Sequence, residues 1–180
     1  MNNHQLDSLL RHMVGDSFGG VWASDQLPQV KQLFRYPLYM IVNTHPSHMP
    51  GEHWLAVTLE GDNVGTFFDS FGFPPNFSHY PKSILQFLEK QCKTVLHHNR
   101  QLQNVLSTAC GQHCVFYLCK RASGLSYENV LSLYQDDVIK NDATVTNFVK
   151  KYQRCERRHK DTHFNHSVCS LQMFKDCYKM

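Results

Sequence analysis

The chain has 180 residues, of which 42% are hydrophobic and 18% are charged, and its net charge is +3 at pH 7. This composition is typical of a folded globular protein and excludes a disordered chain, and the length fits one domain spanning residues 1–180. A net charge this small does not by itself indicate a nucleic-acid partner. No stretch approaches the roughly 20 apolar residues of a membrane span, and the first residues show no secretion signal. We therefore expect an intracellular protein without a membrane partner.

The N-terminal half predicts a short helix followed by a small sheet. Residues 4–13 carry apolar side chains at the spacing of one helical face, and the glycine pair at 19–20 predicts a turn. A continuous apolar run at 38–44 predicts a buried strand. Residues 53–60 and 64–71 predict two more strands, which a tight turn of Gly, Asp and Asn joins as an antiparallel hairpin.

The C-terminal half predicts mainly helices. Apolar spacing predicts a helix over 82–94, and residues 102–107 predict a short strand that leads into a helix over 110–121. Two further helices are expected at 127–133 and 144–158. Together the elements predict the α+β class, with a small, mostly antiparallel central sheet and helices packed around it.

The string STACGQHC, ending at Cys114, places two cysteines four residues apart. It could be half of a metal site, a redox pair, a packed helix start or a nucleophile at a helix N-terminus. The chain holds seven cysteines, an odd number, and shows no secretion signal, so we expect mostly free thiols.

A metal site finds weak support in the sequence. The twelve histidines make it worth testing, and the tail holds cysteines and histidines at helical spacing. Structural zinc sites usually draw two close ligands from one turn, and the tail has no CxxC knuckle. A histidine-rich surface helix is the simpler interpretation of the pattern, and we expect no metal. The tail residues concerned are Cys155, His159, His163, His166 and Cys169.

A redox pair is also weakly supported. The spacing of Cys110 and Cys114 differs from the CxxC of thioredoxin-like sites. Cys114 and Cys119 lie among apolar residues and are predicted to be small buried hydrophobes. Gln112 and His113 are interpreted as ordinary helix residues.

The interpretation of Cys110 as a nucleophile is supported by other residues of the chain that could act with it. Cys110 would begin a helix, where free backbone N–H groups and the helix dipole favour the thiolate. His53 and Asp69 fall nearly opposite each other at the open end of the hairpin, so a base and its orienter could meet. Gln103 precedes the helix and could donate to an oxyanion together with the Cys110 N–H. Taken singly, a solvated histidine, a turn cap and a surface glutamine are equally ordinary explanations.

Four strings, YMIVNT, GEHWLAV, FFDSFGF and QNVLSTACGQHC, together resemble the adenovirus protease (adenain) family, which has relatives in other viruses and in virus-like Polinton (Maverick) transposons. In that family a His-Trp pair, an acidic residue before a Phe-Gly-Phe string and a Gln before an Ala-Cys-Gly motif occur in this order. The resemblance covers roughly residues 18–121 and fades in the C-terminal third. Asp69 stands where adenovirus enzymes have Glu, and Asp also fills this role in the related SUMO proteases.

The resemblance implies a role for each residue of the site. Cys110 would be the nucleophile, His53 the general base and acid, Asp69 the orienter of the imidazole, and Gln103 the oxyanion donor. The reaction would be peptide-bond hydrolysis by a monomer without a metal or organic cofactor. Relatives cleave after glycine. The resemblance also implies that the substrates are virion precursor proteins, which would be processed in the virion and the host nucleus.

Adenovirus enzymes are activated by a short viral peptide, which is disulfide-linked to the protease, and by DNA. Cys92 lies in the equivalent interval and is the candidate for the peptide disulfide, although an ordinary helix thiol is the simpler interpretation. A basic run could contact DNA phosphates, or it could be a solvated helix face. The residues of this basic run are Lys150, Lys151, Arg154, Arg157, Arg158 and Lys160.

Two other functions remain open from the sequence. The same clan includes proteases that deconjugate ubiquitin-like proteins, and the absence of a long regulatory extension favours the viral type only weakly. A non-catalytic, nucleic-acid-binding virion protein is the alternative outside the enzymes. The presence of His53, Asp69, Gln103 and Cys110 together argues against it.

Overall fold

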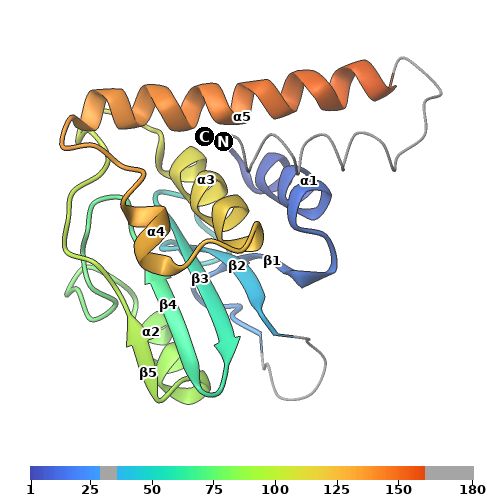
Figure 1. The fold of residues 1–180 in the computed structure, drawn as a ribbon. Coiled ribbons are helices and arrows are strands. Elements are labelled where there is room, and N and C mark those ends of the chain that lie inside the picture. Colours follow the sequence, from blue (N-terminus) through green and yellow to red (C-terminus); the bar gives the residue numbers. More distant parts are fainter. Residues whose placement is uncertain (29–35, 161–180) are drawn as a thin grey trace.

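The computed structural model describes residues 1–28 and 36–160, and for 155–160 it describes the backbone alone. Within these residues, five strands form one sheet in the order β1-β2-β3-β4-β5 (Figure 1). The strands are β1 (Phe18–Ala23), β2 (Leu38–Asn43), β3 (Trp54–Gly61), β4 (Val64–Phe68) and β5 (Thr94–Leu96).

Strand directions make the sheet mixed. The three central strands pair antiparallel, whereas the edge strands β1 and β5 run parallel to β2 and β4 respectively. The predicted α+β class is confirmed. The antiparallel strands that were predicted form the centre of the observed sheet. Neither edge strand was predicted from the sequence.

Helices cover both faces of the sheet, which is why every residue of β2 is buried. Alternate strand residues such as Ile41 and Ala56 pack against α1, α3 and α5, and the residues between them, such as Met40 and Val57, pack against α2. In Figure 1, α5 crosses over α3, and α3 lies between α5 and the sheet. The helices are α1 (Asn3–Val14), α2 (Lys82–Gln91), α3 (Cys110–Ala122), α4 (Tyr127–Leu131) and α5 (Val138–Lys160), with a 3-10 helix at Gly15–Ser17.

The predicted hairpin of β3 and β4 is confirmed, and it fixes what meets at its open end. Asp62 and Asn63 adopt φ values of 49° and 60°, the left-handed conformation that a two-residue hairpin turn of the mirror-image type requires. Ala56 then lies opposite Phe68. Beyond this pair on the open side, His53 lies just before β3 and Asp69 just after β4, so both are brought to the same edge of the sheet.

The strand predicted over 102–107 is wrong. The N–H groups of Leu102 and Gln103 both donate to the Ser70 carbonyl, and Ser107 N–H turns back to the Asn104 carbonyl. These bonds form a loop and not a ladder. Apolar residues at 102, 105 and 106 imitate a strand in sequence, but Leu106 is 91% exposed.

The turn predicted at 19–20 is also wrong, because both glycines lie within β1. The register of β1 against β2 shifts between Phe18 and Val21, and Gly20 has a φ of 105°. A glycine pair here supplies the backbone freedom of an irregular edge strand.

The clearest differences from the predicted helix boundaries are in α2, α4 and α5. The helix predicted over 82–94 ends at Gln91, since Cys92 is extended and the following residues pair with β4 as β5. The helix predicted over 127–133 ends at Leu131. The last helix starts at Val138 instead of 144, because the Asp137 carboxylate accepts hydrogen bonds from the N–H groups of Ile139 and Lys140.

Candidate active site

A cavity of about 720 Å³ opens at the edge of the sheet where the hairpin ends. Its walls come from the loop before β3, the segment between β4 and α2, and the segment that leads into α3. His53, Gln103 and Cys110 all line it, and the Asp69 carboxylate lies directly behind His53. The structure therefore brings the four residues singled out in the sequence to one place.

His53 and Asp69 form the central contact. The imidazole Nε2 lies 2.6 Å from Asp69 Oδ1. Because Nε2 is occupied in this way, Nδ1 is the ring nitrogen left for the hydrogen bond that the imidazole makes with the Cys110 thiol. The ring of Phe71 stacks on the imidazole, with the centroids 5.1 Å apart. The carboxylate, imidazole and thiol are consequently linked in series.

Asp69 is held as a carboxylate by its neighbours. Its side chain is 1% exposed, and its Oδ2 accepts from the Tyr80 hydroxyl at 2.8 Å and from Phe73 N–H at 2.9 Å. Burial alone would raise the pKa of Asp69, but the hydrogen bonds and the positive charge of His53 outweigh it, so the pKa is lowered from its ordinary value. No sequence pattern indicated that Tyr80, eleven residues further along the chain, would be one of these partners.

The imidazole is correspondingly held in its charged form. Burial would lower the pKa of His53, but its hydrogen bonds to Asp69 and Cys110 raise it to about 9. A charged imidazole next to a thiol stabilises the thiolate.

Cys110 is the first residue of α3 and is 8% exposed. Burial would raise the pKa of its thiol, but the hydrogen bond and charge of His53, with the backbone N–H groups of Trp54 and Gly111, lower it below the ordinary value. The N-terminal end of the helix dipole acts in the same direction. The contacts thus favour the thiolate and imidazolium pair over the neutral thiol and imidazole.

Gln103 lies in the cavity wall, but both ends of its amide have protein partners. Its Oε1 accepts from Ser70 Oγ at 2.6 Å, and its Nε2 donates to the carbonyl and hydroxyl oxygens of Ser107 at 2.9 and 3.1 Å. The amide is therefore oriented with its nitrogen toward the segment that enters α3.

Cys114 and His113 show what the rest of α3 does. Cys114 is fully buried as predicted, and its Sγ lies 3.2 Å from the Trp54 carbonyl as a donor. Burial raises the pKa of this thiol well above its ordinary value, so Cys114 is not a second reactive cysteine. The interpretation of His113 as an ordinary helix residue is wrong: it is fully buried and contacts Asp142 at 2.8 Å. A polar residue inside the apolar stripe of the helix was the available signal.

The remaining candidates lie away from the cavity. Cys92 is 8% exposed at the end of α2, its Sγ packs against Gly65 of β4, and burial raises the pKa of its thiol. Of the basic run, Lys150, Lys151 and Arg154 are exposed on α5. The side chains of Arg157, Arg158 and Lys160 lie outside the described residues, as do the histidines and cysteines of the tail that entered the zinc hypothesis.

Neither a metal cluster nor a membrane-spanning helix was found among the described residues. No group of three or more Cys, His, Asp or Glu side chains in this part of the chain is arranged to hold a metal ion. No helix in the same residues is long and apolar enough to cross a membrane.

The fold and these contacts define an α+β protein with a thiol, an imidazole and a carboxylate in series at a cleft. Comparison with known proteins finds a relative with a matching description, the "Protease" of Porcine adenovirus A serotype 3, with 33% identity over 110 residues. The match covers 53% of this chain and 54% of that protein, so the chain spans about half the length of the relative it matches. No family model matches the chain. The similarity supports a distant relationship with an adenovirus protease.

Proposed function

We propose that this chain is a cysteine endopeptidase of the adenovirus protease type, and that it processes viral precursor proteins. The observation that carries the proposal is the His53 imidazole, which lies between the Asp69 carboxylate and the Cys110 thiol at the start of α3. The relationship with an adenovirus protease supports the same reaction independently of the geometry.

In the proposed reaction, the Cys110 thiolate attacks the carbonyl carbon of the scissile peptide bond. A tetrahedral intermediate forms, and its oxyanion lies next to the N-terminus of α3. The backbone N–H of Cys110 is one donor to it, and the Gln103 amide is the other when the substrate oxygen replaces Ser107 Oγ as its acceptor.

His53 then transfers its proton from Nδ1 to the leaving amine, and the C–N bond breaks. The thioester that remains on Cys110 is hydrolysed by water, from which the now neutral imidazole takes a proton. Asp69, which accepts from Nε2 throughout, holds the ring in one orientation and stabilises its charged form.

Covalent labelling tests the proposal. The wild-type protein, Cys110→Ala and the control Cys92→Ala are incubated with a glycine-ending peptide vinyl sulfone, and the modified residue is mapped by mass spectrometry. Wild type and Cys92→Ala should carry the probe on Cys110, and Cys110→Ala should carry none. Labelling that persists in Cys110→Ala, or a wild type that neither labels nor hydrolyses a peptide, contradicts the proposed function.

The substrate is proposed from the resemblance. Relatives cleave after glycine, so we propose virion precursors with Gly-X junctions as the targets, in the virion and host nucleus. Incubation with such precursors and with glycine-linked ubiquitin-like conjugates separates the two protease types: preferential release of the ubiquitin-like protein would assign the chain to the deconjugating enzymes instead.

Activation by a peptide and by DNA belongs to the same proposal. A disulfide to Cys92 requires its buried thiol to become accessible, so the peptide should raise the alkylation rate of Cys92 before it forms the bond. For DNA, replacement of the exposed Lys150 and Arg154 by Gln should weaken binding and reduce the slope of log affinity against log salt by about two. An unchanged slope would contradict a DNA contact on this face of α5.

A further inference from the structure

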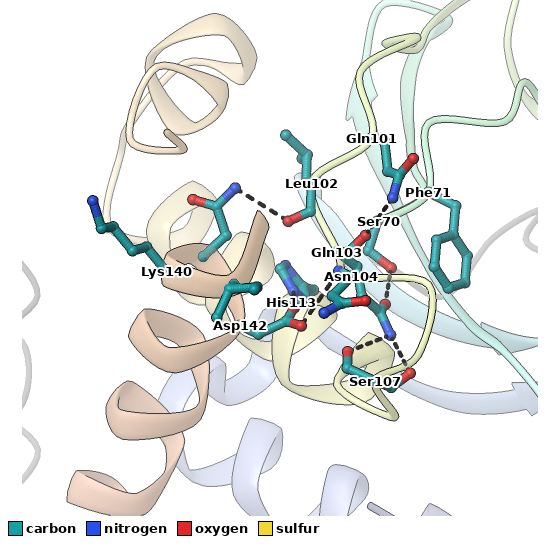
Figure 2. A network of polar contacts seen from close by, with 12 residues as sticks. Ser70, Phe71, Gln101, Leu102, Gln103, Asn104, Ser107, His113, Lys140 and Asp142 are labelled. Atoms are coloured by element: carbon teal, nitrogen blue, oxygen red, sulfur yellow. Dashed lines mark hydrogen bonds and ion pairs between the residues drawn. The ribbon is translucent and has the colours of Figure 1, made fainter. Parts of the chain in front are cut away.

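The segment that carries Gln103 is clamped from two sides (Figure 2). On the sheet side, Leu102 N–H and Gln103 N–H donate to the Ser70 carbonyl at 2.8 and 3.0 Å, and Ser70 Oγ donates to the Gln103 side chain. Ser70 directly follows Asp69, so this side ties the segment to the carboxylate of the site.

The other side of the clamp is the start of α5. Asn141 Nδ2 donates to the Leu102 carbonyl at 3.1 Å, and Asp142 Oδ2 accepts from Asn104 N–H at 3.3 Å. These two contacts fall on the residues immediately before and after Gln103. The position of Gln103 along the cleft is therefore set by α5 as well as by the sheet.

His113 connects this clamp to the helix of the nucleophile. Its Nε2 lies 2.8 Å from Asp142 Oδ1, its ring stacks on Tyr134 at 5.6 Å between centroids, and its side chain is fully buried. Burial lowers the pKa of His113 and outweighs the opposing effect of Asp142, so the imidazole is neutral and donates through Nε2. The negative charge stays on Asp142, where it strengthens the bond from Asn104 N–H.

We propose that His113 and Asp142 are a positioning pair that sets the Gln103 amide relative to Cys110. The inference rests on the proposed function, since it assigns the pair to the oxyanion donor of that reaction. His113 and Cys110 belong to one helical turn of α3. The pair therefore fixes the position of Gln103 relative to the same helix that carries the Cys110 sulfur. Neither residue touches the substrate.

Asp142→Asn is the sharpest variant, because it preserves the size of the side chain. If its carbonyl oxygen keeps the bond from His113, its NH₂ group faces the Asn104 N–H, and two donors oppose each other. Glu89→Gln, an exposed carboxylate on α2 on the opposite face of the sheet, makes the same change of charge and is the matched control.

Asp142→Asn should lower kcat for peptide hydrolysis about tenfold with KM changed less than twofold, because an oxyanion donor acts mainly in the transition state. The rate and pH profile of Cys110 alkylation by iodoacetamide should stay unchanged, since they report the thiolate and imidazolium alone. A general loss of folding would instead lower both rates together, and that result would overturn the proposal.

A double-mutant cycle tests whether Asp142 acts through Gln103. Gln103→Ala should cost about 10²- to 10³-fold in kcat, as removal of one oxyanion donor does. Adding Asp142→Asn to Gln103→Ala should then cost less than twofold. A full further tenfold loss would show that the two residues act independently and would overturn the proposal.

A readout without catalysis separates this inference from the proposed function. In ¹⁵N-labelled protein, the two side-chain amide protons of Gln103 should shift in Asp142→Asn and not in Glu89→Gln. Unshifted Gln103 signals in Asp142→Asn would overturn the positioning pair whether or not the protein is active. Shifted signals in a protein that never cleaves a peptide would support the clamp and contradict the proposed function.

Discussion

Two histidine–aspartate pairs among the described residues differ in what surrounds the imidazole. His53 and Asp69 lie 2.6 Å apart at the cleft, and His113 and Asp142 lie 2.8 Å apart between α3 and α5. The pKa of His53 is raised to about 9, whereas the pKa of His113 is lowered. The same two residue types therefore give opposite charge states.

Partners on the second ring nitrogen explain the difference. Both imidazoles are penalised by burial, but His53 also contacts the Cys110 thiol, and together Asp69 and Cys110 overcome the penalty. His113 is more deeply buried, and its Nδ1 has no hydrogen-bond partner among the described residues. For these two buried imidazoles, a carboxylate alone does not offset the cost of burial, whereas a carboxylate together with the Cys110 thiol does.

Removing the cleft imidazole should have the largest effect. His53→Ala leaves Cys110 without its base and without the charge that lowers its pKa, so kcat/KM should fall by about 10⁴-fold, as for loss of a member of a catalytic triad. Peptide hydrolysis and iodoacetamide alkylation at pH 7 measure it, with His4→Ala on the exposed side of α1 as the control. Activity within tenfold of wild type would exclude His53 as the base.

Replacing the carboxylate at the cleft should change the charge of the imidazole. Asp69→Asn should lower activity by about 10²-fold or more, as a ring held less firmly is a poorer base. In wild type, peptide hydrolysis should decline as the pH rises through about 9, where His53 loses the proton that it would donate to the leaving amine. In Asp69→Asn this decline should move to lower pH, whereas the control Asp7→Asn should leave it in place.

The pair between α3 and α5 should respond differently to the same kind of change. His113→Phe keeps the stacking on Tyr134 but removes the partner of Asp142 Oδ1, so it should cost about 1–3 kcal/mol of stability and about tenfold in kcat. The alkaline decline of peptide hydrolysis should not move. A shift of that decline would mean that His113 affects the charge of His53 directly.

Stability against pH should separate the two histidines. The folded pKa of His53 lies above that of the unfolded chain, about 6.5, so its contribution is complete below pH 6.5 and is lost as the pH rises through about 9. The pKa of His113 is lowered in the folded protein. Its neutral form therefore contributes stability to the fold that is lost as the pH falls below about 6.5. Urea unfolding should show a flatter alkaline limb in His53→Ala and a flatter acid limb in His113→Phe.

The smallest effect is expected from the outermost partner of the cleft pair. Tyr80→Phe removes one hydrogen bond to Asp69, while Phe73 N–H still donates to the same oxygen. Activity should fall about 3- to 10-fold, equivalent to roughly 1 kcal/mol for one bond. Tyr127→Phe is the matched control, because the Tyr127 hydroxyl has no hydrogen-bond partner among the described residues. Equal activity in both variants would remove Tyr80 from the support of Asp69.

The difference between the two pairs also marks what the sequence could predict. His53 and Asp69 lie on one hairpin, and a local turn fixes their register, so their meeting followed from counting along two strands. His113 and Asp142 are brought together by the packing of α5 on α3, which no local pattern encodes. The same applies to Tyr80, whose hydroxyl reaches Asp69 through the loop before α2.

The loop at 102–107 shows a second limit of pattern alone. Its apolar residues imitate a strand, but its backbone bonds go to Ser70 and to its own turn. Gln103 was still placed at the cleft, because the resemblance rests on a Gln before an Ala-Cys-Gly motif and does not depend on the conformation between them. Position in the chain was therefore a better guide here than local structure.

Helix α3 carries both the sulfur of Cys110 and the imidazole of His113, and this has a consequence for thermal motion. A rigid helix that rocks or slides moves both groups together. Through Asp142 and Asn104, the segment that holds Gln103 is coupled to the same movement. Vibrations of the helix should thus displace the Cys110 sulfur and the Gln103 amide in the same direction, so that the distance between them fluctuates less than the distance of either from the sheet.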